Sequence, residues 1–367
     1  FFLLKRNIVN AFTIFAFTIT AFTFFTLIQT KMKKLLYVSV LIFFCFAGQR
    51  IYGQDTNIEP RVSKLEGFVA KLPSISGFVN LRYQYEENAN GFDIRRARLD
   101  FKGNLAKWMD YRLQVDFASS PKIIDAFIRF KINPMFNVQV GQFKYAFSLE
   151  NPYSPLNVET IENSQVISYL SGYNDASGVK ATGRDFGISF YGGFFQMDGY
   201  NLIDYTIGLY NGTGINAKDD NKHKDFTGRI DIHPIKAITL SGSYYNGKLG
   251  TDGSLQPRER WSAGIRYDDS KALLRSEYIK GKTFDFVSDG FYVLAGYKFC
   301  DKIMPLFKYD YLHKDLSKED SKQTNYVIGV DYWPYKNFRL QLNYTYRTFS
   351  DTAKNSGLLG LMFTARF

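Results

Sequence analysis

The chain has few of the residues from which catalytic and metal-binding sites are usually built. Its 367 residues include 2 cysteines and 3 histidines. Cys45 lies in an apolar N-terminal segment and Cys300 stands alone in the remainder, so we expect no internal disulfide. There is no Gly-x-Ser-x-Gly motif, and no Cys/His cluster has metal-ligand spacing. These absences argue against an enzyme, and we expect no cofactor and no metal site.

A strong charge imbalance is also missing from most of the chain. The formal net charge is +11, but six of the 46 basic residues and none of the 35 acidic residues precede Gln54, which leaves about +5 for the rest. Such a mild excess does not indicate a nucleic-acid-binding protein, and no nucleic-acid partner is expected.

The mean hydropathy of -0.22 argues against a helical bundle in an inner membrane. What the chain has instead is alternation of apolar and polar residues. One example is the segment 338–347, in which Phe, Leu and Tyr alternate with Arg, Gln, Asn and Thr. Successive side chains of a strand point to opposite faces, so this period of two predicts a sheet with one apolar and one polar face.

Strand length and aromatic content indicate where the apolar face lies. Soluble sandwiches use strands of about five or six residues, whereas tilted strands of about nine to eleven residues suit a bilayer. The 26 tyrosines and 35 phenylalanines fit the aromatic girdles of such a barrel, and the last segment places Phe363 and Phe367 on its outer face. The sequence therefore predicts an all-β fold, a transmembrane antiparallel up-and-down β-barrel of a bacterial outer membrane.

The residues before the barrel are interpreted as processing signals. We expect residues 32–53 to be a cleaved signal peptide, because a basic start precedes a short apolar run and small residues. Residues 1–31 are interpreted as a translated upstream segment outside the fold, and an inner-membrane anchor is the alternative. Residues 54–74 form a periplasmic lead-in with one possible short helix, and 75–367 form the barrel.

The alternation predicts sixteen strands. An even number places both barrel termini on the periplasmic side. The predicted ranges are 75–86, 92–105, 109–117, 123–133, 136–147, 184–192, 202–212, 225–233, 237–247, 259–268, 272–281, 289–299, 303–313, 323–333, 338–349 and 357–367.

The connections differ in length at the two ends of the predicted strands. Those assigned to the periplasm are mostly tight, with residues 193–201 as an exception, and those assigned to the outside are longer and charged. Residues 148–183 form the longest connection, and a stretch of that length without regular structure usually has a function. We expect this third external loop to fold inward and constrict the channel.

A barrel of this size encloses water, so inward-facing side chains decide what passes. Alternation along the first four strands, which we call strand parity, places seven of their cations on one inner wall. Guanidinium groups bind phosphate or carboxylate through paired donors. These residues are Arg82, Arg96, Arg98, Lys102, Arg112, Arg129 and Lys131. The alternative is that they pair with carboxylates of the same wall. Those carboxylates belong to Glu86, Asp100, Asp116 and Asp125.

The long loop has the opposite charge. Its carboxylates belong to Glu150, Glu159, Glu162 and Asp175, set against Lys180. An acidic loop that faces a basic wall predicts a transverse electric field, as in general diffusion porins, and weakens strict anion selectivity.

Several motifs are similar to one known family. The segment 92–103, Phe-Asp-Ile-Arg-Arg-Ala-Arg-Leu-Asp-Phe-Lys-Gly, resembles the second-strand signature of the phosphate-selective porin O and P family. Further resemblance lies at 141–150, 183–187, 210–214 and 229–234. The resemblance implies a sixteen-stranded barrel, a homotrimer, and uptake of small anions such as phosphate.

Two other interpretations stay open, a general diffusion porin of weak selectivity and a plugged structural or adhesive barrel. As partners we expect small anionic solutes, outer-membrane lipid and lipopolysaccharide. We also expect the barrel-assembly machinery to recognise the C-terminal Phe367.

Overall fold

The computed structural model describes residues 72–367. The predicted upstream segment, signal peptide and most of the lead-in lie outside the described residues. Within residues 72–367, no helix is long and apolar enough to cross a membrane.

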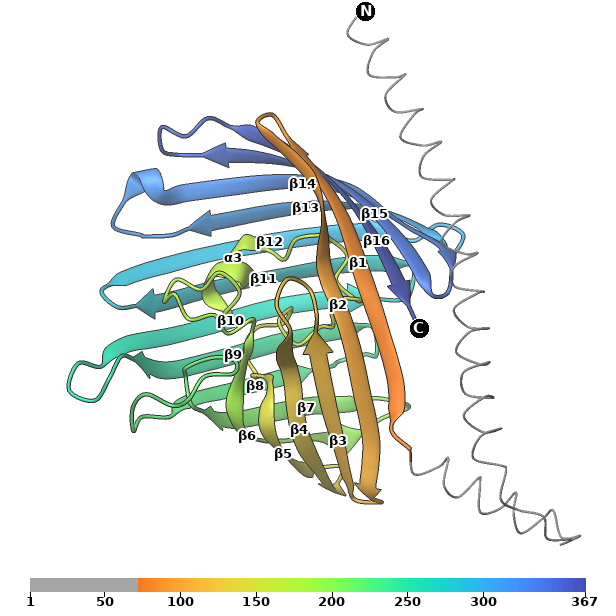
Figure 1. The fold of residues 1–367 in the computed structure, drawn as a ribbon, viewed down its shortest axis with the longest axis vertical. Helices are drawn as coiled ribbons and strands as arrows, with labels where there is room; N and C mark the ends of the chain where they lie inside the picture. Colours follow the sequence, from red (N-terminus) through yellow and green to blue (C-terminus); the bar gives the residue numbers. More distant parts are fainter. Residues whose placement is uncertain (1–71) are drawn as a thin grey trace, which may run out of the picture. The chain divides into compact units, whose positions relative to one another are not determined.

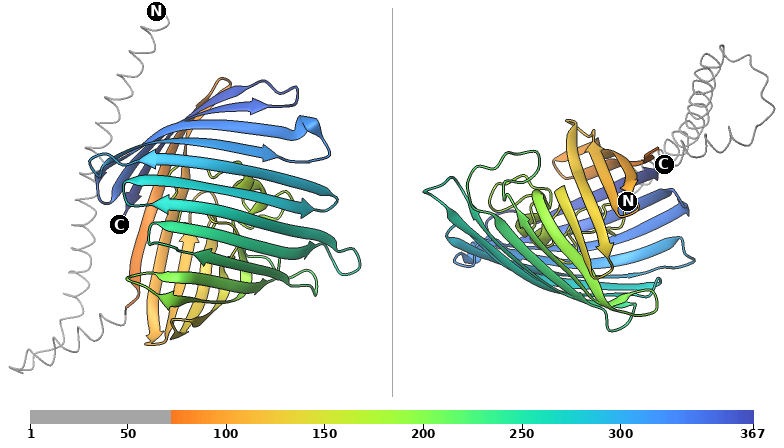
Figure 2. Two further views of the ribbon diagram at one scale, coloured as in Figure 1. Left: turned by 180° about the vertical axis from the view of Figure 1, so that it is seen from behind. Right: turned by 90° about the horizontal axis from the view of Figure 1, so that it is seen from below.

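Sixteen antiparallel strands form a closed barrel, as the alternation predicts (Figures 1 and 2). Each strand pairs with its neighbours in sequence, and β1 closes the ring on β16. The strands are β1 (Ser74–Glu86), β2 (Ala89–Ala106), β3 (Met109–Asp116), β4 (Lys122–Asn133), β5 (Phe136–Lys144), β6 (Arg184–Gln196), β7 (Asn201–Tyr210), β8 (Asp225–Ile232), β9 (Ile238–Leu249), β10 (Gln256–Asp268), β11 (Ala272–Thr283), β12 (Phe286–Tyr297), β13 (Ile303–His313), β14 (Lys322–Tyr335), β15 (Phe338–Phe349) and β16 (Ser356–Arg366).

The alternation of side chains explains why these segments close into a barrel. In β15, Arg339 and Gln341 are buried inside, whereas Leu342 and Tyr344 are 46% and 43% exposed on the outside. Large apolar side chains are exposed on the outer face of nearly every strand. Such an apolar surface is unfavourable in water but stable against the hydrocarbon of a bilayer. Closure of the sheet into a barrel also leaves no strand edge with unpaired backbone groups.

Several predicted strand ends are wrong by up to four residues, and side-chain contacts explain two of them. The fifth strand ends at Lys144 and not at residue 147, because Tyr145 and Phe147 leave the sheet and are buried in an apolar core. The sixth strand continues to Gln196, so the supposedly long connection 193–201 is a turn of residues 197–200. Phe194 extends the pairing, since its ring stacks on Tyr205 of β7 at 5.4 Å.

The longest connection lies between β5 and β6 and spans residues 145–183; we call it the long loop. It carries the short helix α3 (Gln165–Leu170), which contacts β11, β12 and β13. In Figures 1 and 2, α3 lies between the β1–β5 side of the barrel and the opposite strands. The loop side chains Phe147, Ile167 and Leu170 pack with inward-facing Tyr245 and Ile279. The protein therefore has an apolar core inside the barrel.

Asn151 and Gly183 hold the two ends of the long loop together. The Asn151 side-chain amide donates to the carbonyl oxygens of Tyr145 at 3.3 Å and of Gly183 at 3.2 Å. Gly183 has a φ of +70°, and a Cβ there would lie 2.0 Å from the Asn151 Oδ1 atom. Glycine is needed at this point for both reasons.

Candidate functional site

The predicted cations lie on four adjacent strands, β1 to β4, whose inner face we call the basic wall. Six of the seven have a carboxylate partner. Arg82 binds Asp93 (2.7 Å) and Arg98 binds Asp116 (2.8 Å). Lys102 and Arg112 share Asp100, at 2.9 and 2.8 Å, and Arg129 and Lys131 share Asp110, at 2.8 and 3.1 Å. Of the acidic residues predicted on this wall, Asp125 binds Arg112 and Arg184, and Glu86 binds Arg347.

Because two carboxylates each serve two cations, pairing does not cancel the positive charge around them. The side chains of Lys102, Arg129 and Lys131 also remain 49%, 42% and 45% exposed, so they stay in contact with water. Exposed pairs of this kind contribute at most about 1 kcal/mol to stability. These side chains are therefore accessible to a passing ion.

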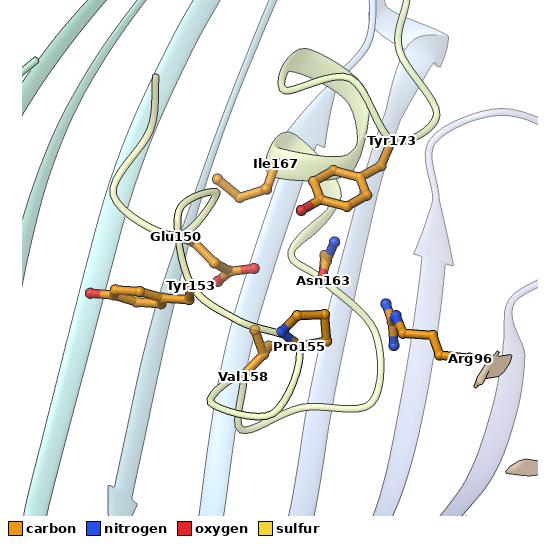
Figure 3. Close-up of a pocket in the computed structure, with 8 residues that line it drawn as sticks. All are labelled: Arg96, Glu150, Tyr153, Pro155, Val158, Asn163, Ile167 and Tyr173. Atoms are coloured by element: carbon orange, nitrogen blue, oxygen red, sulfur yellow. The ribbon is translucent and has the colours of Figure 1, made fainter. Parts of the chain in front are cut away.

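Arg96 differs from the other six cations. It has no hydrogen bond or ion pair with any residue that the structure describes. Figure 3 shows its guanidinium reaching from β2 towards Pro155 and Asn163 of the long loop. Together with Glu150, Tyr153, Val158, Ile167 and Tyr173, these residues line a small pocket. An arginine keeps its charge at physiological pH, and the one carboxylate that attracts Arg96, that of Glu162, already binds Arg95 and Arg82. One positive charge is therefore in excess at the boundary between wall and loop.

A β-bulge adds one cation that parity does not predict. Asn80 of β1 pairs with Arg96, but Leu81 pairs with Ile94, which leaves Arg95 as an extra residue on β2. The bulge turns Arg95 inward beside Arg96. There Arg95 binds both carboxylate oxygens of Glu162 in the long loop, and Arg82 donates to the same carboxylate at 2.6 Å. The available signal was the pair of consecutive arginines, Arg95 and Arg96, which interrupts the alternation of polar and apolar residues.

This bridge controls the ionisation of Glu162. Desolvation inside the barrel would raise its pKa, but the positive charges and hydrogen bonds of Arg95 and Arg82 lower the pKa of Glu162 to about 2. Above the bridge lies a cavity of about 460 Å³, lined by Arg82, Arg95, Asp93, Asp116 and Lys122 among others.

The other three predicted loop carboxylates turn away from the basic wall. Glu150 and Glu159 both bind Arg275 of β11, at 3.1 and 2.8 Å. Asp175 forms two hydrogen bonds with Arg260 of β10, at 2.7 and 2.6 Å, and although desolvation opposes it, Arg260 lowers the pKa of Asp175 to about 2. Of the four predicted loop carboxylates, only Glu162 forms an ion pair with a residue of β1 to β4. The expected arrangement of a whole acidic loop facing a basic wall is therefore wrong. Lys180, the loop's predicted cation, is exposed.

The inner face of β10 to β15, opposite the basic wall, is what we call the far wall. Its buried polar side chains form hydrogen bonds with the backbone of the long loop. Glu277 accepts hydrogen bonds from the Leu149 amide at 2.7 Å and from the Ser148 hydroxyl at 3.0 Å. Asp310 accepts one from the Gln165 amide at 2.9 Å, at the start of α3. Arg339 donates to the carbonyl oxygens of the loop residues Leu156 and Val158, at 3.0 and 2.9 Å. The loop is thus fixed to β11, β13 and β15 by charge-assisted hydrogen bonds, which are stronger than neutral ones.

These anchoring residues were not singled out from the sequence. Parity places Arg260, Arg275 and Arg339 inside the barrel, but parity alone does not tell a water-exposed cation from one covered by a loop. The acidic long loop was the one indication of these residues in the sequence, because carboxylates buried inside a barrel need cationic partners. Within residues 72–367, no group of three His, Cys, Asp or Glu side chains is placed to hold a metal ion.

Comparison with known proteins supports this architecture. Residues 75–239 match the family model "Phosphate-selective porin O and P". A comparison with curated proteins finds no match.

Solved structures with a similar fold are outer-membrane channels. An anion-selective porin from Comamonas acidovorans aligns with a TM-score of 0.64 and 14% identity, over 80% of this chain and 99% of that one. OmpF of Salmonella typhi, in complex with daunomycin, aligns at 0.59 and 14%, over 82% and 99%. The channel DcaP of Acinetobacter baumannii aligns at 0.59 and 13%, over 80% and 97%. The similar structures include a trimer form of OmpT from Vibrio cholerae, at 0.55 and 12%, over 80% and 99%.

At these identities the structures establish the fold alone, and the family match over residues 75–239 supports a channel function. The barrel therefore has the fold of an outer-membrane porin, and residues 75–239 are similar to the phosphate-selective porin O and P family.

Proposed function

We propose that this porin lets small solutes diffuse passively through the outer membrane and favours small anions such as phosphate. The observation that carries this proposal is the Arg96 guanidinium between the basic wall and the long loop, which forms no ion pair with any described residue. Arg82 and Arg95 lie next to it and pair with Asp93 and Glu162, so the three arginines keep one positive charge in excess of the two carboxylates. A cation without a partner in a confined space attracts anions and repels cations.

The proposed route passes first through the cavity above the Arg82–Glu162–Arg95 bridge and then beside Arg96. Below Arg96 it follows Arg112 and the half-exposed Lys102, Arg129 and Lys131. Each paired carboxylate keeps these cations from holding an anion tightly, and fast passage needs sites that bind weakly. The long loop narrows this route, because it fills the space next to β11, β12 and β13.

A general diffusion porin of weak selectivity is the second candidate. It is favoured by the pairing of six of the seven predicted cations. A plugged structural or adhesive barrel is the third, favoured by the apolar core between loop and wall.

The remaining sequence predictions are proposals that follow from this function. They include a homotrimer, export by the signal peptide 32–53, the segment boundaries at residues 31, 53 and 74, and contacts with outer-membrane lipid and lipopolysaccharide. Recognition of Phe367 by the assembly machinery and the lack of any catalytic activity belong to the same set.

Planar-bilayer recordings test the proposal. Reversal potentials are measured under gradients of chloride, phosphate and a large organic anion. We expect small anions to permeate better than potassium and the large anion to be excluded. Neutralising Arg96, Arg98 and Arg112 together should lower the anion-to-cation permeability ratio, and an unchanged reversal potential would reject the basic wall as the selective element. A barrel that stays closed would favour the plugged candidate.

A further inference from the structure

The outer face of β9 to β11 carries charged residues where an outer-membrane barrel normally presents apolar side chains to lipid. On β11 the outward-facing residues run from Leu274 through Tyr278 to Lys280 and Lys282, because the intervening Arg275, Glu277 and Ile279 are buried inside. On β9 the same alternation leads from Tyr244 to Lys248, both of which are exposed. Lys248, Lys280 and Lys282 form what we call the lysine patch.

The three lysines lie close together near the extracellular ends of their strands. Lys280 is paired in register with Trp261 of β10, and Lys282 with Glu259 of the same strand. Lys248 is paired with Pro257 on the other edge of β10. Adjacent strands are about 4.8 Å apart, so the three ammonium groups lie within reach of one phosphorylated headgroup.

None of the three ammonium groups is neutralised within residues 72–367. Two carboxylates share the surface, but neither forms an ion pair with these lysines. The side-chain amide nitrogen of Asn246 lies 3.5 Å from a carboxylate oxygen of Glu259. The Tyr278 hydroxyl donates a hydrogen bond to the Asp289 carboxylate at 2.9 Å. The simplest explanation for lysines on this face would be ion pairs with carboxylates of neighbouring strands. Within residues 72–367 the three lysines form no such pair.

An aromatic row lies in register with Lys280 and directly below Lys248 and Lys282. Tyr244 and Trp261 are 44% and 45% exposed, and the Trp261 and Tyr278 rings are 5.3 Å apart. Such a row marks the level where hydrocarbon gives way to headgroups. The lysines therefore sit at the depth of the lipid phosphates. Long lysine side chains place their charge in the polar layer while their stems cover apolar surface.

The opposite side of the barrel lacks this feature. β10 lies halfway round the ring from β2. At the extracellular ends of the strands on that side the exposed outward residues are aromatic, including Tyr85, Phe92 and Phe117. The charged surface is thus local, and it cannot be explained as a general property of the barrel rim.

From this placement we propose that the lysine patch binds the phosphate groups of a phosphorylated glycolipid in the outer leaflet. The lysines supply the positive charge, and Tyr244, Trp261 and Tyr278 pack against the sugar and the first acyl carbons. Clustered lysines next to an anionic membrane surface each add binding energy. The proposal depends on the outer-membrane location of the barrel and not on which solute it conducts.

Native mass spectrometry of the purified full-length porin in detergent, with EDTA present, tests this proposal. The probes are bisphosphorylated lipid A, the same lipid A after dephosphorylation, and inorganic phosphate. We expect the wild type to bind phosphorylated lipid A at least about tenfold more tightly than the dephosphorylated form. The variant Lys248→Gln/Lys280→Gln/Lys282→Gln should lose that preference, and the corresponding triple Lys→Arg variant should keep it.

The matched control removes the same charge from the periplasmic turns, through Lys107→Gln/Lys236→Gln/Lys302→Gln. It should bind phosphorylated lipid A as the wild type does. Gel mobility before and after heating verifies that each barrel is folded. The proposal is overturned if the patch variant keeps the preference, or if inorganic phosphate displaces the lipid A. The patch variant should also keep wild-type conductance and reversal potential, which separates this test from that of the proposed channel function.

Discussion

The two inner walls of this barrel use the same chemistry for different purposes. On the basic wall, Arg129 and Lys131 bind Asp110 and remain nearly half exposed. On the far wall, Arg275 binds Glu150 and Glu159 with none of its side chain exposed. The difference lies in the long loop, which covers Arg275 and leaves Arg129 and Lys131 open to water. An arginine–carboxylate pair is therefore a structural anchor or part of a conducting surface depending on whether water reaches it.

Removing the long loop should erase this difference and gives the largest expected effect. Because Asn151 and Gly183 already lie together, residues 153–180 can be replaced by two glycines without stretching the chain. Single-channel conductance in planar bilayers should rise several-fold, since the apolar core inside the barrel disappears. Removing residues 351–354 from the exposed β15–β16 connection is the matched control and should leave conductance unchanged. An unchanged conductance after the larger deletion would reject the loop as the constriction.

Substituting one arginine on each wall should separate anchors from surface residues. Arg275→Met leaves two loop carboxylates without a counterion, and breaking a buried pair in this way costs about 3–5 kcal/mol. Arg129→Met disrupts a pair in contact with water and should cost less than about 1 kcal/mol. Urea unfolding in lipid vesicles measures both free energies. Equal losses would show that the long loop does not protect the far wall from water.

Glu162→Gln should sharpen the role of the bridge between the loop and the basic wall. The substitution frees the charges of Arg82 and Arg95 and keeps the side-chain volume, so the anion-to-cation permeability ratio should rise by about twofold or more. The matched control is Asp175→Asn, which removes a loop carboxylate on the far wall. A fall in the ratio for Glu162→Gln would place this carboxylate outside the ion path.

Acidification is expected to have the smallest effect. The pKa of Glu162 and the pKa of Asp175 are each about 2, below the ordinary values of their side chains. A lowered folded-state pKa gives stability that is complete above the ordinary pKa and lost only as the pH falls through the folded value. The contacts of Glu162, and with them the reversal potential, should therefore stay constant between pH 7 and about pH 4.5. A transition near pH 5 would mean that these loop contacts are weaker than the structure indicates.

The fold was predictable because one physical rule governs all of it. Lipid outside and water inside impose a period of two on every strand, and the alternation located all sixteen strands with small errors at their ends. The error at the end of the fifth strand occurs where another interaction dominates. Tyr145 and Phe147 continue the alternation beyond Lys144, but they enter the core under the long loop.

The site was less predictable, since it depends on departures from that rule. A bulge turns Arg95 inward, and no parity argument assigns two consecutive arginines to one face. Alternation also cannot show that Arg96 has no ion-pair partner within residues 72–367 while Arg98, two residues later, binds Asp116. That distinction depends on the position of the long loop inside the barrel. The alternation of polar and apolar residues along the strands does not predict this position.

The central claim is that the unpaired charge of Arg96 directs anions through this porin. The most direct test compares reversal potentials of the wild type, Arg96→Gln and Arg98→Gln under a potassium chloride gradient. A unit charge about 4 Å from an ion in water is worth about 1 kcal/mol, so Arg96→Gln should lower the anion-to-cation permeability ratio by up to about fivefold. Arg98→Gln, whose charge is cancelled by Asp116, should change the ratio far less. Equal ratios for the wild type and Arg96→Gln would contradict the account.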